Sequence, residues 1–150
     1  MTSTALRTLD INDANGGIVN PAFLERAERV HRELRPQLPA DYRATMERVF
    51  AGGGRLVVAA RGDDVVGVAV YRVYENTCDG VNMYVDDLVT DPAARSGGVG
   101  HALMEHMQAI ARRAGCKAYR LDSGTHREQA HKFYFREGMV VKAFHFVKPC

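Results

Sequence analysis

Runs of apolar residues in this chain of 150 residues predict a series of short strands. The runs are short and are separated by turn residues such as Gly62 and Asp63. Two apolar runs that lie only a few turn residues apart favour a hairpin. The expected strands are residues 5–9, 55–61, 65–74 and 82–90, a strand around Tyr119 and Leu121, and a final strand from about Val140 to Val147.

Apolar residues that recur every three or four positions predict four helices between these strands. The first helix follows Asn20, a favourable capping residue, and has Pro21 at its tolerated first position. The second begins near Pro39 and ends at Gly52–Gly54, and the fourth begins near Thr125. The third places a set of apolar residues on one face, which we interpret as core: Val99, Ala102, Leu103, Met107, Ile110, Ala111 and Ala114.

The order of these elements predicts an α/β (α+β) fold with a mixed, mostly antiparallel sheet flanked by helices on both faces. A chain of this length is expected to form a single domain, residues 1–150, whose core needs no metal or disulfide. Cys78, Cys116 and Cys150 are odd in number and lack Cys-x-x-Cys spacing, which argues against a disulfide framework or a zinc site. We therefore expect a cytoplasmic protein without a bound metal.

Charge and hydropathy exclude several classes of partner. The 20 Lys and Arg residues nearly balance the 18 Asp and Glu residues, so no overall field attracts nucleic acid or a membrane surface. No apolar run approaches the roughly 20 residues of a membrane span, and Met1–Arg7 lacks the apolar segment of a signal peptide. We expect a soluble, unprocessed protein whose partner must be inferred from a site.

The most informative segment is the junction between the strand that ends near Thr90 and the helix that follows it. Gly97, Gly98 and Gly100 occupy three of four positions, so backbone N–H groups can approach a ligand without side-chain obstruction. The start of the helix adds unpaired donors and the positive end of the helix dipole, which together suit a diphosphate. Neither the Walker A motif nor the dinucleotide fingerprint fits, because Gly-Lys-Ser/Thr is absent and Leu103 replaces a glycine. An ordinary turn remains the alternative.

The pattern Arg-x-x-Gly-x-Gly, formed by Arg95, Gly98 and Gly100, resembles the acetyl-CoA pyrophosphate loop of the GNAT N-acetyltransferase superfamily. With the segment described next, this resemblance covers roughly residues 55–147, and the first fifty residues fit only in outline. The expected order of strands and helices also matches that fold. The resemblance implies an acetyl-CoA-dependent N-acetyltransferase, with acetyl-CoA as co-substrate.

A second segment resembles the other cofactor motif of the superfamily, Asn-x-x-Ala-x-x-x-Tyr-x-x-x-Gly-Phe. Ala130, Tyr134 and Gly138 fall at the expected spacing. Arg127 stands where Asn is usual, which puts one cofactor contact in doubt, and Met139 replaces the usual Phe. We expect Arg127 to pair with a cofactor phosphate instead.

The resemblance also assigns the remaining cofactor contacts. Backbone N–H groups from Ser96 through His101 are implied to bind the pyrophosphate, while the pantetheine arm pairs with the edge of the preceding strand. The cofactor-binding residues implied in this way are Leu88, Val89, Thr90, Arg95, Ser96, Gly97, Gly98, Val99, Gly100, His101 and Arg127.

Two residues are candidates for acid–base chemistry. An alkylammonium has a pKa near ~10, so a carboxylate must remove its proton, and related polyamine acetyltransferases have a catalytic carboxylate at the position of Asp86. Tyr134 is the candidate acid for the departing thiolate. Each also fits a structural role: Asp86 at a strand end or paired with an arginine, and Tyr134 in an aromatic core with Phe133 and Phe135.

The acceptor is expected to be a small amine, an amino acid or an aminoglycoside-like polyamine, because Glu75, Asp79, Asp86 and Asp87 place carboxylates near the presumed cleft. Asp87 and Glu75 are the candidate substrate-binding residues, and a strand bulge would bring Asp86 and Asp87 to the same side. Acetylation of a protein N-terminus or lysine is an alternative, and so is a non-catalytic acyl-CoA-binding module. Exposed edge strands allow a homodimer, although no residue specifies one.

Overall fold

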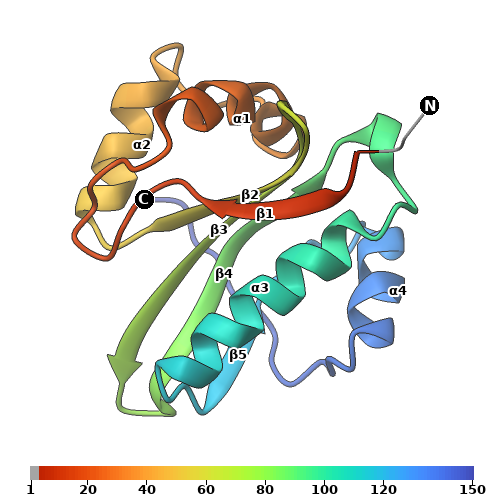
Figure 1. Ribbon diagram of the computed structural model, residues 1–150. Coiled ribbons are helices and arrows are strands. Elements are labelled where there is room, and N and C mark those ends of the chain that lie inside the picture. The colour runs from red at the N-terminus through yellow and green to blue at the C-terminus, as the bar shows by residue number, and fades with distance from the viewer. Residues whose placement is uncertain (1–3) are drawn as a thin grey trace. The chain divides into compact units, whose positions relative to one another are not determined.

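The computed structural model describes residues 4–150, so the expectation for Met1–Arg7 falls in part outside it. The chain divides into two compact units, one that ends at Arg120 and a second that comprises Leu121–Cys150. Within residues 4–150, none of the helices is both long and apolar enough to cross a membrane. The elements are β1 (Leu6–Asp10), α1 (Pro21–Leu34), α2 (Tyr42–Ala51), β2 (Arg55–Arg61), β3 (Asp64–Asn76), β4 (Gly80–Thr90), the 3₁₀ turn η1 (Pro92–Ala94), α3 (Val99–Arg113), β5 (Ala118–Leu121) and α4 (Glu128–Arg136) (Figure 1).

The strands form one five-stranded sheet in the order β1-β2-β3-β4-β5. β1 pairs with β2, β2 with β3 and β3 with β4, each time in antiparallel orientation. The hairpin predicted at Gly62 and Asp63 is present, because β2 ends at Arg61 and β3 begins at Asp64. The predicted fold class, a mostly antiparallel sheet with helices, is confirmed.

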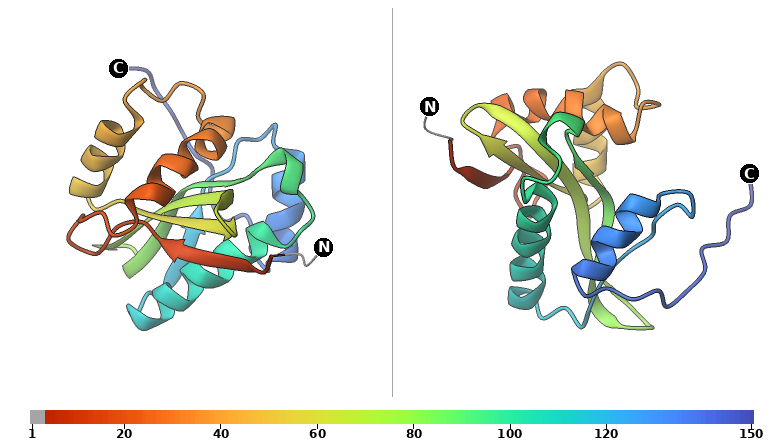
Figure 2. Two further views of the ribbon diagram at one scale, coloured as in Figure 1. Left: turned by 45° about the horizontal axis from the view of Figure 1, so that its top comes forward. Right: turned by 90° about the vertical axis from the view of Figure 1, so that its right-hand side faces the viewer.

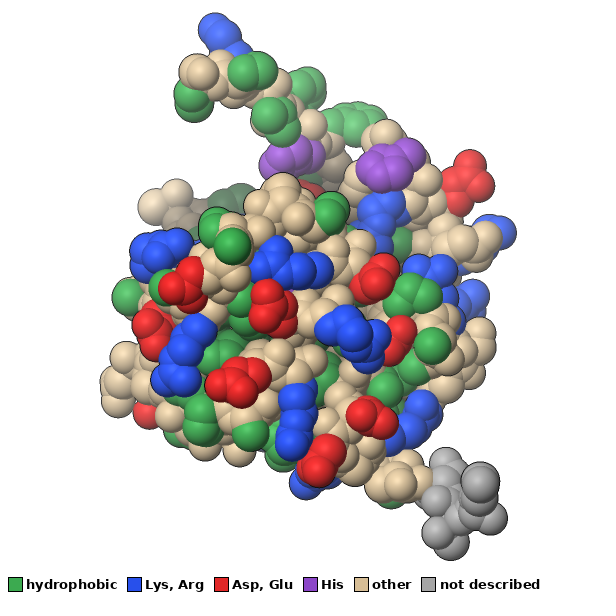
Figure 3. Space-filling view, turned by 90° about the horizontal axis from the view of Figure 1, so that it is seen from above, with side chains coloured by type: hydrophobic (Ala, Val, Ile, Leu, Met, Phe, Trp, Pro, Cys, Tyr) green, Lys and Arg blue, Asp and Glu red, His purple; other side chains and the backbone are tan. Residues whose placement is uncertain are grey.

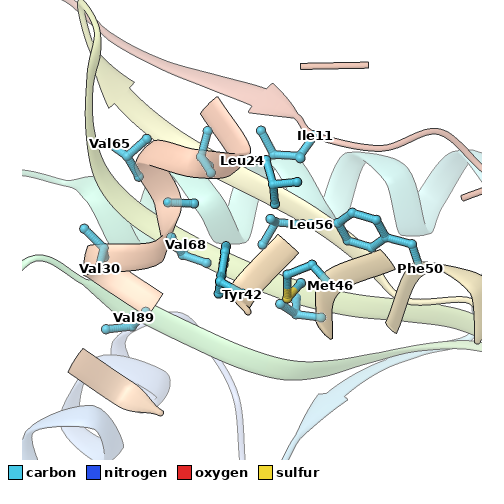
Figure 4. Packing of buried hydrophobic residues seen from close by; sticks show 13 residues of the cluster. Ile11, Leu24, Val30, Tyr42, Met46, Phe50, Leu56, Val65, Val68 and Val89 are labelled. Carbon is cyan, nitrogen blue, oxygen red and sulfur yellow. The ribbon is translucent and has the colours of Figure 1, made fainter. Parts of the chain in front are cut away.

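One face of the sheet packs against α1 and α2 to form the main core (Figure 4). β2 and β3 contribute alternate residues to it, as expected for side chains that project to opposite faces of a strand. The buried residues of this layer include Leu56, Val58, Val65, Val68, Val70 and Val89 from the sheet, Ile11 just after β1, and Leu24, Ala27, Val30, Tyr42, Met46 and Phe50 from the two helices. α1 packs against β3, β4 and α2.

The opposite face of the same strands packs against α3 (Figure 2). Gly67 permits this contact, because a Cβ there would overlap Val99 Cγ1 and lie 3.0 Å from Leu103 Cδ1. Val99 and Leu103 are both buried, in agreement with the predicted core face of this helix. The missing side chain at Gly67 therefore lets the start of α3 lie close to the sheet, directly after the glycine loop.

The predicted final strand is wrong. Residues 140–147 form no strand, and their large apolar side chains are mostly exposed, including Phe144 at 85% and Phe146 at 91%. Apolar residues favour a strand only where a neighbouring strand satisfies the backbone groups, and the sequence pattern does not specify that neighbour. Within this second unit, His145 Nδ1 instead lies 2.9 Å from Asp122 Oδ2.

Two details of the first helices also differ from expectation. Asn20 is at the N-terminal cap position of α1, yet its side-chain amide donates to the Asp10 carbonyl at 2.7 Å and makes no cap bond. α2 begins at Tyr42 rather than near Pro39, because the Asp41 carboxylate accepts a hydrogen bond from the Ala44 N–H at 2.9 Å. A side-chain cap therefore sets the helix start, as is usual for Asp.

Candidate active site

A β-bulge in β4 brings two neighbouring carboxylates to one side of the sheet. Val70 of β3 pairs with Asp87 and Tyr71 pairs with Val85, so Asp86 is the extra residue. Without the bulge, Asp86 and Asp87 would project to opposite faces. Both instead line the same pocket.

Asp87 is held in a network that ties α1 and α2 to β4. Its Oδ2 lies 2.7 Å from Nε2 of the buried His31, and its Oδ1 accepts from Arg35 Nε at 2.7 Å. The other ring nitrogen, His31 Nδ1, lies 3.0 Å from the Tyr42 hydroxyl. Both oxygens of Asp87 and both nitrogens of His31 are therefore engaged.

The electrostatics of this network fix where its protons lie. Burial disfavours the charged form of Asp87, but His31 and Arg35 outweigh that effect and hold the pKa of the carboxyl below its usual value. Burial is also the main cause that raises the pKa of Tyr42, so the phenol remains protonated. An ionised carboxylate can only accept, so the proton of this bond lies on His31 Nε2, which donates to Asp87. Asp87 is therefore ionised, and both of its oxygens are bonded to groups of the protein.

Asp86 has a different environment. Its Oδ2 accepts from Arg72 Nε at 2.8 Å, and Arg72 Nη1 also donates to the Gly52 carbonyl at the end of α2, at 3.2 Å. The side chain of Asp86 is 32% exposed, whereas that of Asp87 is 13% exposed. Of the two carboxylates, Asp86 is the one that an acceptor can reach.

These groups surround a pocket of about 120 Å³. Its polar side is made by the two carboxylates, an imidazole and a guanidinium, and the rest of its lining is apolar. The lining residues are His31, Leu38, Met46, Val49, Val70, Arg72, Asp86 and Asp87. Such a concave site with a few convergent polar groups is typical of a small-molecule pocket.

The carboxylates near this pocket do not create the unbalanced negative field that the sequence suggested. Asp86 pairs with Arg72, Asp87 pairs with Arg35, and Asp79 pairs with Arg120 at 2.8 Å. The face in Figure 3 likewise shows acidic and basic side chains interspersed. The expected attraction of a cation by bare carboxylates is therefore weaker than the count of acidic residues implies.

Glu75 is not brought to the pocket. It is exposed and pairs in register with Val81, near the turn of the β3–β4 hairpin. At about 3.3 Å per residue, the stretch of β3 from Val70 to Glu75 spans roughly 16 Å. The prediction that Glu75 binds the acceptor has no support from this position.

The pocket also contains residues that the sequence analysis missed: His31, Arg72 and, behind them, Arg35 and Tyr42. Two of them left a signal in the sequence. His31 follows Leu24 and Ala27 at helical spacing, which places it on the buried face of α1, and Arg72 interrupts an otherwise apolar strand. A polar residue at a core position implies a polar partner, but the sequence does not identify that partner.

The glycine loop lies between η1 and α3. Asp91, the residue before η1, accepts hydrogen bonds from the Ala93 N–H at 3.0 Å and from Arg29 Nη2 at 2.8 Å. Ser96 and Gly98 have φ values of 65° and 75°, in the left-handed region, and Gly98 is the N-terminal cap residue of α3. Such turns gather backbone N–H groups into concavities that bind anions.

Side chains around the loop leave its outer surface open. Arg95, Ser96, Gly97 and Gly98 are exposed, and nothing lies within 4 Å of a Cβ built on Gly98. Arg61, at the end of β2, donates from Nη2 to the Gly97 carbonyl at 3.2 Å and so connects the loop to the sheet. The chemistry and exposure of this donor set fit a diphosphate group.

The remaining predicted site residues lie on either side of this loop in sequence. Leu88, Val89 and Thr90 end β4 and are in register with Ala69, Val68 and Gly67. In the second unit, Arg127 is the N-terminal cap residue of α4, and Tyr134 lies two residues before the end of this helix with its ring 5.6 Å from that of Phe133.

Comparison with known proteins identifies the family of the chain. The family model described as Acetyltransferase (GNAT) family matches residues 21–139. The chain is 32% identical over 95 residues to "Uncharacterized N-acetyltransferase YhdJ" of Bacillus subtilis (strain 168), and this match covers 53% of this chain and 67% of that protein. It is 34% identical over 64 residues to the aminoalkylphosphonate N-acetyltransferase of Salmonella typhimurium (strain LT2), which covers 43% of this chain and 42%, less than half, of that protein.

The fold has close counterparts among solved structures. The aminoglycoside acetyltransferase AAC(6')-Iy, in complex with a bisubstrate analogue that contains CoA, has a TM-score of 0.78 and 19% sequence identity. The match covers 97% of this chain and 99% of that one. At this identity the likeness concerns the fold. Because the range matched by the family model, residues 21–139, runs from the start of α1 past the end of α4, the chain belongs to the GNAT family of acetyltransferases.

Proposed function

We propose that the protein is an N-acetyltransferase that moves an acetyl group from acetyl-CoA directly to the primary amine of a small cationic molecule. The observation that carries this proposal is the bulge in β4, through which Asp86 and Asp87 line one pocket. An amine acceptor needs a nearby carboxylate, because its ammonium form is not nucleophilic. The acceptors named for the similar Salmonella typhimurium protein, aminoalkylphosphonates, are also small amines.

In this proposal Asp86 is the base and takes the proton of the ammonium, directly or through one water. The amine nitrogen then forms a bond to the thioester carbonyl carbon, the bond from that carbon to sulfur breaks, and Tyr134 is proposed to give its phenolic proton to the departing thiolate. Asp87 is proposed to line the acceptor side of the pocket, where its bonds to His31 and Arg35 hold the carboxylate in place. The shorter reach of Asp compared with Glu favours a water relay.

The glycine loop is proposed to hold the diphosphate of the co-substrate with backbone N–H groups from Ser96 through His101. The left-handed residues Ser96 and Gly98 and the start of α3 support this assignment. Thr90 and the two residues before it are proposed to pair with the pantetheine arm, and Arg127 with a phosphate. The family match extends across both compact units, which supports one acetyltransferase domain over residues 1–150.

Replacing Tyr134 by Phe is expected to lower kcat by about 100-fold, because general acid catalysis contributes about 10²- to 10⁴-fold. Burial raises the pKa of Tyr134 against the opposing charge of Arg127, so the phenol holds a proton but releases it less readily. The contribution should therefore lie at the low end of that range. The measurement is kcat at saturating acceptor, with the dissociation constant for acetyl-CoA from calorimetry.

Tyr74→Phe is the matched control, since Tyr74 is exposed on the β3–β4 hairpin and does not line the pocket. It should leave kcat unchanged. An unchanged kcat in Tyr134→Phe, or a loss of acetyl-CoA binding as large as the loss of kcat, would assign Tyr134 to structure rather than to acid catalysis.

Two alternatives remain in the proposal: acetylation of a protein N-terminus or lysine, and a binding module that takes up acyl-CoA without transfer. The test is release of CoA thiol from acetyl-CoA in the presence of cationic amines, amino acids, aminoglycosides or short peptides, against a control without acceptor. Release with small amines supports the proposal, and release with peptides alone supports protein acetylation. Acetyl-CoA binding without release for any acceptor supports the binding module.

A further inference from the structure

We propose that the acceptor is a compact zwitterion, in which the primary amine is joined by a short aliphatic segment to a carboxylate or phosphonate that Arg72 binds. This inference rests on the proposed transfer to a primary amine and replaces the simple cation of that proposal by an amine that also carries an anionic group. It starts from the Arg72–Asp86 pair, a cation and an anion that share the polar side of one pocket.

The guanidinium of Arg72 is oriented but not saturated. Nε donates to Asp86 and Nη1 donates to the Gly52 carbonyl, which fixes the plane of the group between β4 and the end of α2. A guanidinium has five N–H donors, and among the described residues these two bonds engage one donor on each of two nitrogens. With 40% of the side chain exposed, the remaining donors can form the paired bonds that arginine makes to carboxylate and phosphonate oxygens.

Charge balance distinguishes a zwitterion from a simple cation. Asp86 and Asp87 are offset by Arg72 and Arg35, so the pocket has no negative excess to receive an ammonium alone. An acceptor with one ammonium and one anionic group leaves this balance intact. A polycation adds several positive charges beside the guanidinium of Arg72, and among residues 4–150 no carboxylate besides Asp86 and Asp87 lines the pocket to offset them.

Binding of the anionic group to Arg72 also places the amine of the acceptor beside Asp86. While Arg72 is paired with Asp86, Arg72 Nε occupies Oδ2 of the carboxylate. An anionic group on the acceptor binds the remaining donors of Arg72 and so becomes a second anionic partner of this guanidinium, beside Asp86. The ammonium of the same molecule then lies beside Asp86, so binding and proton removal are coupled through one side chain.

The size and lining of the pocket limit the rest of the acceptor. A volume of about 120 Å³ is well below the roughly 300–1,000 Å³ of sites for drug-sized ligands. Leu38, Met46, Val49 and Val70 supply its apolar walls. These features suit a short carbon chain between the two charged ends.

The experiment compares kcat/KM for four acceptors: β-alanine, its neutral amide, diaminopropane and aminoethylphosphonate. We expect at least one of the two zwitterions to exceed the amide and the diamine by about 10- to 100-fold, the range expected of hydrogen bonds to a charged group. The better of the two identifies the anionic group. Stabilisation of the protein by each acceptor in a thermal shift assay gives a second readout that needs no turnover.

Arg72→Gln is expected to abolish the preference, mainly through a higher KM for the zwitterion, and Arg72→Lys to retain part of it because charge remains without the planar fork. Arg120→Gln is the matched control: Arg120 also pairs with an aspartate at 2.8 Å and is 39% exposed, but it lies outside the pocket. It should preserve the preference.

A wild-type preference for diaminopropane or the amide would overturn this inference while leaving the transferase intact. So would an Arg72→Gln variant that loses activity equally with all four acceptors. Absence of thiol release and of thermal stabilisation with every probe would count against both the inference and the proposed small-molecule acceptor.

Discussion

Replacing Asp86 by Asn should lower kcat by about 10²- to 10⁴-fold while leaving the affinity for acetyl-CoA almost unchanged. The amide oxygen can still accept from Arg72 Nε, so the bulge and the pocket keep their shape. What the variant loses is a group that takes up a proton. The measurement is steady-state thiol release with the best acceptor, together with calorimetric titration of acetyl-CoA.

The residual rate of Asp86→Asn should also depend more steeply on pH than that of the wild type. Without a base, only the free amine reacts, and its fraction rises about tenfold per pH unit below the amine pKa near ~10. Asp79→Asn is the matched control, because Asp79 is also paired with an arginine but does not line the pocket. A wild-type kcat in Asp86→Asn, or equal losses in both variants, would remove Asp86 from the proposed mechanism.

The sequence predicted the scaffold well where the pattern itself contains the physical cause. Strand 55–61 is flanked by turn residues and is apolar between Arg55 and Arg61, and β2 has the same bounds. The glycine-rich start of α3 depends on local backbone conformation, and Gly98 has the positive φ that its residue type favours. The strand expected at 140–147 depends instead on a partner elsewhere in the chain, and nothing in the pattern specifies one.

The sequence indicated only some residues of the candidate pocket, because the others reach it through contacts between segments that are distant in the chain. Asp86 was predicted from the resemblance to related polyamine acetyltransferases, which needs only the match of one stretch of sequence. Its partner Arg72 is fourteen positions earlier in the chain, and the pair forms only because β3 and β4 are adjacent and β4 is bulged. His31 is still more distant in sequence, fifty-six positions before Asp87. Tertiary packing alone brings these residues together.

The second large effect is expected on stability, from Asp87→Ala. This change leaves the buried His31 without its acceptor and Arg35 without its carboxylate, and a buried donor left unsatisfied typically costs about 1–3 kcal/mol. We expect about 2 kcal/mol at pH 7, since Arg35 is 39% exposed and can regain water. Chemical denaturation of both proteins measures the difference. Asp63→Ala, at an exposed ion pair, should change stability by no more than about 0.5 kcal/mol.

The pH dependence of this difference identifies its cause. Because the folded-state pKa of Asp87 is held below the unfolded value of about 3.9, its ionised form stabilises the protein above that pH. The contribution is lost as the pH falls through the folded-state pKa, so the gap between wild type and Asp87→Ala should narrow below about pH 4. Asp10 and Asp91 also have lowered pKa values, but they titrate in both proteins and cancel in the difference. A gap that stays constant from pH 7 down to pH 3 would mean that Asp87 stabilises the fold through packing rather than through its charge.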